Sequence, residues 1–165
     1  MQFYSQHECE EWLSQRERLR PDENKSLQSE RFEFPAEAYR FFPVASAVAR
    51  SITYRRPTLL WVTEWGIWPS SENWHLYYRL RESHGDRRLL KDAPGHLFLD
   101  YEVDDLSSYL QLAMLNGWGG YILTHANYVN AFFSHDEYID FFSEMTENLA
   151  ELRAYFAKPA NAGGL

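Results

Sequence analysis

The sequence predicts one α/β domain built on a mixed sheet of about four strands, a parallel core plus a C-terminal β-hairpin, flanked by helices. Apolar, β-rich runs are separated by helical patterns, which is the order expected of crossovers between parallel strands. The last run, 121–133, is interrupted by about three residues, which indicates a hairpin. An α+β sheet with helices on one face is the alternative, because Asp100 and Glu102 make one strand polar on one side.

Composition indicates a single globular unit over residues 1–165. Apolar residues make up 45% of the chain and charged residues 24%, so the chain can bury a core and is not of the disordered class. We expect a helical N-terminal part at about 1–57, a sheet core at 58–133, a C-terminal helix at 134–157 and a tail at 158–165.

The N-terminal part is predicted to contain two helices. Residues 8–19 have an amphipathic pattern, with Cys9 and Trp12 on the apolar face. The polar segment 21–30 lacks periodicity and is predicted as a loop, followed by at most a short extended piece. Pro43 suits a first helical position, and the apolar stripe after it predicts a helix to about Thr53.

The sheet core begins with the apolar run 58–65, a predicted buried strand that ends before Gly66. Ser70 or Ser71 is a suitable N-cap for a third helix that runs to about Ser83. Residues 87–95 are predicted as a loop or a ragged strand edge.

The stretch 97–133 is the centre of the prediction. Residues 97–103 alternate with a period of two and predict a half-buried strand. Asp104 or Asp105 can cap a helix that runs to Asn116, and Gly117 suits the left-handed position after it. The helix is apolar on more than one side, so its second face should be buried or meet a partner. The predicted hairpin strands are 121–124 and 128–133.

The C-terminal helix is predicted over 134–157. Ser134 and Glu137 have the spacing of a capping box. Apolar residues then step by four and three along one face, and acidic residues do the same on the opposite face. The acidic residues are Asp140, Glu144, Glu147 and Glu151.

Charge and composition exclude several functions. The net charge of −8 disfavours nucleic-acid binding, which requires a basic surface for the phosphates. The single cysteine, Cys9, excludes an intramolecular disulfide and a zinc site with several cysteines. No signal peptide, membrane-spanning run or phosphate-binding loop occurs, so we expect a cytoplasmic protein with no cofactor and no membrane contact.

The leading functional hypothesis is a non-catalytic, acidic protein-interaction domain. Its contact surface would be the acidic face of the last helix or the apolar face near Leu112 and Leu115. The partner would be a basic protein, and a homodimer is an alternative. A small, acidic, single-domain, aromatic-rich chain is similar in profile to bacterial immunity or adaptor proteins, which neutralise or tether another protein.

A metal-assisted hydrolase is the second hypothesis. Parallel neighbouring strands would bring together Glu64, Asp100 and His125 at their carboxyl ends, as candidate catalytic residues and metal ligands, with Glu102 as a further candidate ligand. Strand ends are also polar simply because they meet solvent.

A small-ligand binder is the third hypothesis. Trp65 and Trp68 flank Gly66 at a predicted turn, where exposed rings could stack on a sugar or a base. Packing of these rings in the core is the alternative.

Overall fold

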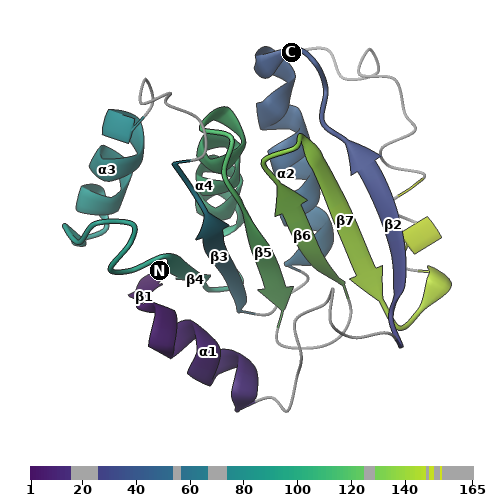
Figure 1. The fold of residues 1–165 in the computed structure, drawn as a ribbon, viewed down its shortest axis with the longest axis horizontal. Helices are drawn as coiled ribbons and strands as arrows, with labels where there is room; N and C mark the ends of the chain where they lie inside the picture. Colours follow the sequence, from purple (N-terminus) through teal and green to yellow (C-terminus); the bar gives the residue numbers. More distant parts are fainter. Residues whose placement is uncertain are drawn as a thin grey trace.

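The computed structural model describes residues 1–15, 26–53, 57–66, 74–124, 129–147, 149–150 and 153. Its centre is a seven-stranded sheet in the order β1-β4-β3-β5-β6-β7-β2, in which every neighbouring pair is antiparallel (Figure 1). The strands are β1 (Gln2–Tyr4), β2 (Gln28–Glu33), β3 (Thr58–Glu64), β4 (Gly95–Phe98), β5 (Gly119–Thr124), β6 (Asn130–Ser134) and β7 (Tyr138–Ser143).

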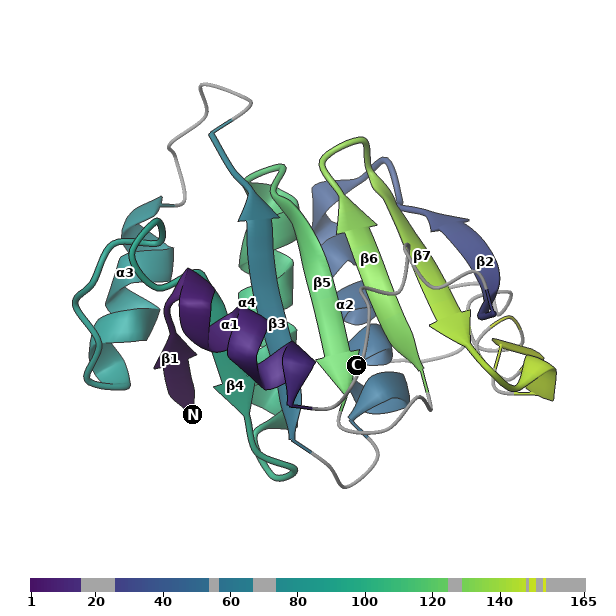
Figure 2. The same ribbon diagram turned by 60° about the horizontal axis from the view of Figure 1, so that its bottom comes forward.

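Helices cover both faces of the sheet. They are α1 (Gln6–Ser14), the short 3-10 helix η2 (Ala38–Arg40), α2 (Phe41–Ile52), α3 (Trp74–Ser83) and α4 (Val103–Leu115). In Figure 2, α1 crosses one face over β3 and β4, whereas α2 and α4 lie on the other face and α3 lies beside the β1 edge. Among the described residues, we find no helix with the length and apolar character needed to cross a bilayer.

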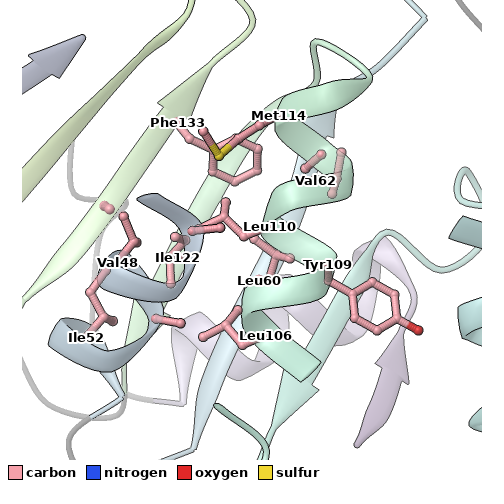
Figure 3. Packing of buried hydrophobic residues seen from close by; sticks show 14 of the residues in the cluster. Val48, Ile52, Leu60, Val62, Leu106, Tyr109, Leu110, Met114, Ile122 and Phe133 are labelled. Carbon is pink, nitrogen blue, oxygen red and sulfur yellow. The ribbon is translucent and has the colours of Figure 1, made fainter. Parts of the chain in front are cut away.

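Alternation along β3 divides the core into two layers. Leu60 and Val62 belong to the larger cluster, which packs under α2 and α4 (Figure 3). Leu59 and Trp61 belong to the smaller cluster, which they share with Trp12 of α1. Because successive side chains of a strand project to opposite faces, a strand covered on both sides has to be apolar throughout.

The C-terminal end of α4 confirms the predicted role of Gly117. The Trp118 N–H donates to the Ala113 carbonyl at 2.9 Å, and the Gly117 N–H donates to the Met114 carbonyl at 3.1 Å. Gly117 has a φ of 60°, so the helix ends in a Schellman turn that requires a residue able to adopt the left-handed region. The turn leads the chain directly into β5.

The predicted parallel core is wrong. The fold is α+β, as in the alternative, but its helices cover both faces of the sheet and not one. The unit β4–α4–β5 is a crossover of the predicted kind, because β3 is antiparallel to both of these strands and they therefore share one direction. However, β3 lies between them in the sheet. No two neighbouring strands are parallel, because this insertion keeps β4 and β5 apart.

The N-terminal part was predicted to be helical, but it also contains strands. It supplies β1, which pairs with β4, and the six-residue strand β2, which pairs with β7 at the opposite edge. The sheet therefore depends on residues far outside the predicted core of 58–133.

The predicted helix over 134–157 is also wrong at its start. Residues 138–143 form β7, which pairs with β6 and β2, and helical residues appear only from Thr146. The supposed capping box is a hairpin turn, in which the Glu137 N–H donates to the Ser134 carbonyl at 3.2 Å and Glu137 has a φ of 65°. The β5–β6 hairpin, in contrast, is confirmed.

The acidic residues consequently do not share one helical face. Asp140 lies in β7, where both carboxylate oxygens accept hydrogen bonds of 2.7 Å from Arg31 of β2. Glu144 and Glu147 are exposed, and Glu151 lies outside the described residues. The acidic stripe on which the predicted partner surface depended is therefore not formed as a helix face.

Candidate functional site

The antiparallel sheet separates the residues of the predicted hydrolase site. Glu64 ends β3 beside the start of β4, whereas Asp100 follows the end of β4, so these two carboxylates lie at opposite ends of the sheet. The Glu102 carboxylate accepts a hydrogen bond from the amino group of Met1. His125 lies outside the described residues, and within the described part of the chain no group of three acidic, histidine or cysteine side chains could hold a metal ion.

The residues named for ligand and partner contact have mixed environments. Trp65 is half-buried and packs against the larger core cluster, whereas Trp68 lies outside the described residues. Leu112 is buried in the same cluster. Leu115 is half-buried and lines a pocket, so one of the two predicted leucines lies at a surface that a ligand can reach.

That pocket has a volume of about 320 Å³, near the lower end of the range for small-ligand sites. It lies where the C-terminal end of α4, the β6–β7 turn and the β2–α2 connection meet, at the upper end of the sheet in Figure 1. We call it the α4–β6 pocket. Its apolar walls are formed mainly by Phe34, Phe41, Met114, Leu115 and Trp118.

The pocket walls are held together by the β6–β7 turn. The Glu137 carbonyl accepts a hydrogen bond of 2.7 Å from the Phe34 N–H, which ties the turn to the segment after β2. The Ser134 hydroxyl accepts a bond of 3.1 Å from the Asp136 N–H. Two chain segments far apart in sequence are thus fixed against each other at the pocket.

His135 lines the pocket and is bonded to a carboxylate of β3. Its Nδ1 lies 2.8 Å from Glu64 Oε2, and its Nε2 lies 3.5 Å from Asp136 Oδ1. Because an ionised carboxylate can only accept, the Nδ1–H of His135 donates to Glu64. Among the described residues no hydrogen bond reaches the second oxygen, Glu64 Oε1, which remains available as an acceptor.

Gly119 leaves the space in which the Glu64 carboxylate lies. A Cβ atom at Gly119 would stand 2.4 Å from Glu64 Oε2. At the neighbouring Gly120, a Cβ would stand 2.2 Å from the Trp61 carbonyl oxygen and 2.9 Å from the Val62 Cα. The first contact is with the end of a flexible side chain and the second is with backbone, so the two glycines serve different purposes.

Asn116 lines the pocket and carries an unpaired acceptor, Oδ1, that is buried from solvent. The side chain is only 5% exposed, and its Nδ2 donates to the Leu112 carbonyl at 2.8 Å, which fixes the orientation of the amide. Its Oδ1 has no hydrogen-bond partner. A buried polar atom without a partner costs on the order of 1–3 kcal/mol, so its retention needs a reason.

A second polar cluster lies between α3, α4 and the sheet, and it is fully enclosed. Arg81 donates to the Tyr77 hydroxyl at 2.5 Å, to the Ala93 carbonyl at 2.9 Å and to Asp86 Oδ1 at 3.1 Å. The Tyr77 hydroxyl lies 2.9 Å from His96 Nε2. Arg81 and His96 are both 0% exposed, so we assign this network to stability and not to ligand contact.

The pKa values of Asp86 and His96 in this network depend on the arginines beside them. Burial alone would raise the pKa of Asp86, but hydrogen bonds from Arg88 and then Arg81 outweigh it and hold that pKa below its ordinary value. Burial, and then the Arg81 charge, lower the pKa of His96 to about 3. His96 is therefore a neutral imidazole at any pH near neutrality.

The two glycines give a matched test of the Glu64–His135 contact. We expect Gly119→Ala to displace the Glu64 carboxylate and break its hydrogen bond to His135, at a cost in folding free energy of a few tenths of a kcal/mol. Gly120→Ala should lower the free energy of unfolding by about 1–3 kcal/mol, because the backbone of β3 has to move. Imidazole ¹⁵N NMR and urea unfolding measure the two effects. Equal costs at both positions would contradict the geometry.

Sequence reasoning named Glu64 but assigned it to a different site. The Glu64–His135 contact spans 71 positions of the chain, so no local spacing reports it. Asn116 was identified only as the end of a helix. The feature of the sequence that could have indicated this site is the cluster Gly117, Gly119 and Gly120. Glycines at the start of a strand mark places where neighbouring groups approach closely.

No protein-family model, no curated protein and no solved structure matches this chain.

Proposed function

We propose that the protein is a non-catalytic protein-interaction domain and that its partner docks at the α4–β6 pocket. The observation that carries the proposal is the largely apolar pocket, whose lining includes Asn116 with its buried, unpaired Oδ1. A partner side chain that enters the pocket gains apolar contact, and one that brings a donor to the buried Asn116 Oδ1 also removes the cost of the unpaired atom.

Exposed aromatic side chains next in sequence to pocket residues favour a macromolecular partner over a small metabolite. The segment that contributes Phe41 to the pocket also contains Tyr39, which is 80% exposed, and Phe42, which is 53% exposed. Exposed aromatic side chains are enriched at protein interfaces, where a few side chains provide most of the binding energy.

The described side chains offer no activated nucleophile, which favours binding over covalent catalysis. A Glu–His pair can act as a general base. A covalent mechanism also needs a nucleophile that is hydrogen-bonded to the imidazole. Ser134 lies next in sequence to His135, yet in the described part of the chain no hydrogen bond joins its hydroxyl to the ring. Cys9 is fully buried, and burial raises the pKa of its thiol.

Selection from a displayed library of random peptides tests the proposal. The wild-type protein is the bait, and the Leu115→Trp variant, whose indole would fill the pocket, is used to deplete peptides that bind elsewhere. We expect enriched peptides that bind the variant at least about tenfold more weakly than the wild type. Leu76→Trp is the matched control, because Leu76 is 45% exposed on α3, away from the pocket, and this change should leave peptide binding intact.

Methionine NMR shows whether a selected peptide occupies the pocket. The chain has three methionines, so selective ¹³C-methyl labelling gives a simple spectrum. Met114 lines the pocket, whereas Met145 is 54% exposed elsewhere. Peptides should shift the Met114 signal and leave Met145 unchanged. The proposal fails when no peptide distinguishes the wild type from Leu115→Trp.

A further inference from the structure

We propose that the side chain inserted into the α4–β6 pocket is an arginine of the partner. This inference rests on the proposed function and adds the chemistry of the anchoring group. Three properties of the pocket support it: the sign of the charge at its rim, the nature of its walls and the polarity of its unpaired atom.

The rim of the pocket is acidic. Glu137 lines the pocket and is exposed. Asp136, 67% exposed, and Glu64, 39% exposed, do not line it, but both contact His135, which does. No lysine or arginine is among the described residues that line the pocket. Arg40 lies in the neighbouring segment, but it is paired with Glu37 at 3.5 Å. A cation would therefore be attracted to this rim, and an anion would be repelled.

The walls suit the apolar stem and flat head of arginine. Phe34, Phe41 and Trp118 contribute aromatic surface, and the Phe34 and Phe41 ring centroids lie 6.2 Å apart. Arginine buries its methylene stem against apolar surface, and its guanidinium stacks on aromatic rings. An ammonium group is more strongly hydrated and would lose more on entering such a pocket, which favours arginine over lysine.

The unpaired atoms at the site are all acceptors. Asn116 Oδ1, a buried atom of a residue that lines the pocket, has no partner, and Glu64 Oε1, beside the pocket, has none among the described residues. A ligand that carries only acceptors cannot satisfy either atom. A guanidinium has five N–H donors, more than any other side chain, so a single group can supply donors to several acceptors.

Arginine and citrulline probes test the inference. Citrulline has nearly the shape of arginine and keeps N–H donors but has no charge. We would titrate the ¹³C-methionine-labelled wild-type protein with N-acetyl-arginine methylamide, N-acetyl-citrulline methylamide and N-acetyl-norleucine methylamide and follow the Met114 methyl signal. We expect the arginine probe to bind about tenfold more tightly than the citrulline probe. The norleucine probe should be the weakest of the three.

A charge-matched pair of variants locates the effect. Glu64→Gln should weaken binding of the arginine probe severalfold and reduce the arginine-to-citrulline ratio. Glu10→Gln removes the same charge on α1, on the opposite face of the sheet, and should change neither quantity. Equal effects of both variants would show that only net charge matters and would overturn the inference.

The outcomes separate this inference from the function on which it rests. Citrulline binding as tight as arginine binding overturns the arginine anchor, and so does a set of pocket-binding peptides that lack arginine. In both cases the protein-interaction function stands. If neither the probes nor any displayed peptide shifts Met114, both proposals fall together.

Discussion

Replacing Arg81 with methionine is expected to lower the free energy of unfolding by about 3–5 kcal/mol, which is the usual cost of removing one partner of a buried ion pair. Arg81 is 0% exposed and donates three hydrogen bonds, to Tyr77, Ala93 and Asp86. Its guanidinium carbon also lies 4.6 Å from the centroid of the Phe3 ring. Methionine keeps much of the stem but removes all three of these hydrogen bonds, while Asp86 keeps those from Arg88.

Urea unfolding at neutral pH measures this effect, and Arg87→Met is the matched control. Arg87 is 83% exposed and its ion pair with Glu82 is at the surface, so its loss should cost no more than about 0.5 kcal/mol. A cost for Arg81→Met within about 1 kcal/mol of the control would contradict the assigned network.

The double variant Arg81→Met/Asp86→Asn tests how much of the lost unfolding free energy comes from the Arg81–Asp86 contact. Asp86 keeps hydrogen bonds from Arg88 at 2.7 Å and 2.8 Å, so the carboxylate is not left alone when Arg81 is removed. Even so, the two positions share one network, and their effects should not add. The double variant should be less destabilised than the sum of the single variants.

The second large effect is a loss of stability on mild acidification that depends on His96. Its Nδ1 lies 3.3 Å from the Leu60 carbonyl and its Nε2 lies 2.9 Å from the Tyr77 hydroxyl, an arrangement that fits a neutral ring protonated at Nδ1. Burial and then the Arg81 charge lower its pKa to about 3 in the folded protein. An unfolded histidine has a pKa of about 6.5.

The sign of the effect follows from proton binding. Between pH about 6.5 and about 3 the unfolded chain binds one more proton at His96 than the folded protein, so acidification favours unfolding. The contribution is fully present above pH about 6.5 and is lost at up to about 1.4 kcal/mol for each pH unit below it.

A comparison of His96→Gln with the wild type isolates this contribution, because only the pH slope matters and not the absolute stability of the variant. From about pH 6.5 to about pH 4.5, the wild type should lose about 2–3 kcal/mol more than His96→Gln. His75 is exposed, and His75→Gln should keep the wild-type slope. Parallel curves for the wild type and His96→Gln would contradict a buried, neutral His96.

Local patterns in the sequence were sufficient for several elements. The apolar run that forms β3 and the β5–β6 hairpin are present close to their predicted bounds, and α4 ends just before Gly117 as expected. These features depend on residues only a few positions apart. Their physical causes are the two-residue period of a strand, a short connection and the left-handed region that glycine tolerates.

The segment 138–143 shows where periodicity fails. Its apolar residues occur in pairs on either side of Asp140, and that pattern fits one face of a helix as well as a strand. Pairing decides the outcome. β7 lies between β6 and β2, where Phe32 and Phe141 meet with ring centroids 5.5 Å apart and Arg31 binds Asp140. No residue near 138–143 in the sequence reveals that β2 will be its neighbour.

The sequence by itself determined the identity of several elements, the acidic charge and the helix end at Gly117. Only the tertiary structure decided strand direction, the role of 138–143 and the site. Because β3 lies antiparallel between β4 and β5, Asp100 and Glu64 lie at opposite ends of the sheet. The hydrogen-bond partner of Glu64 is His135, in the β6–β7 turn. The reason is that strand pairing and buried polar contacts join residues tens of positions apart, and their free energy depends on the complete sheet and not on any local pattern.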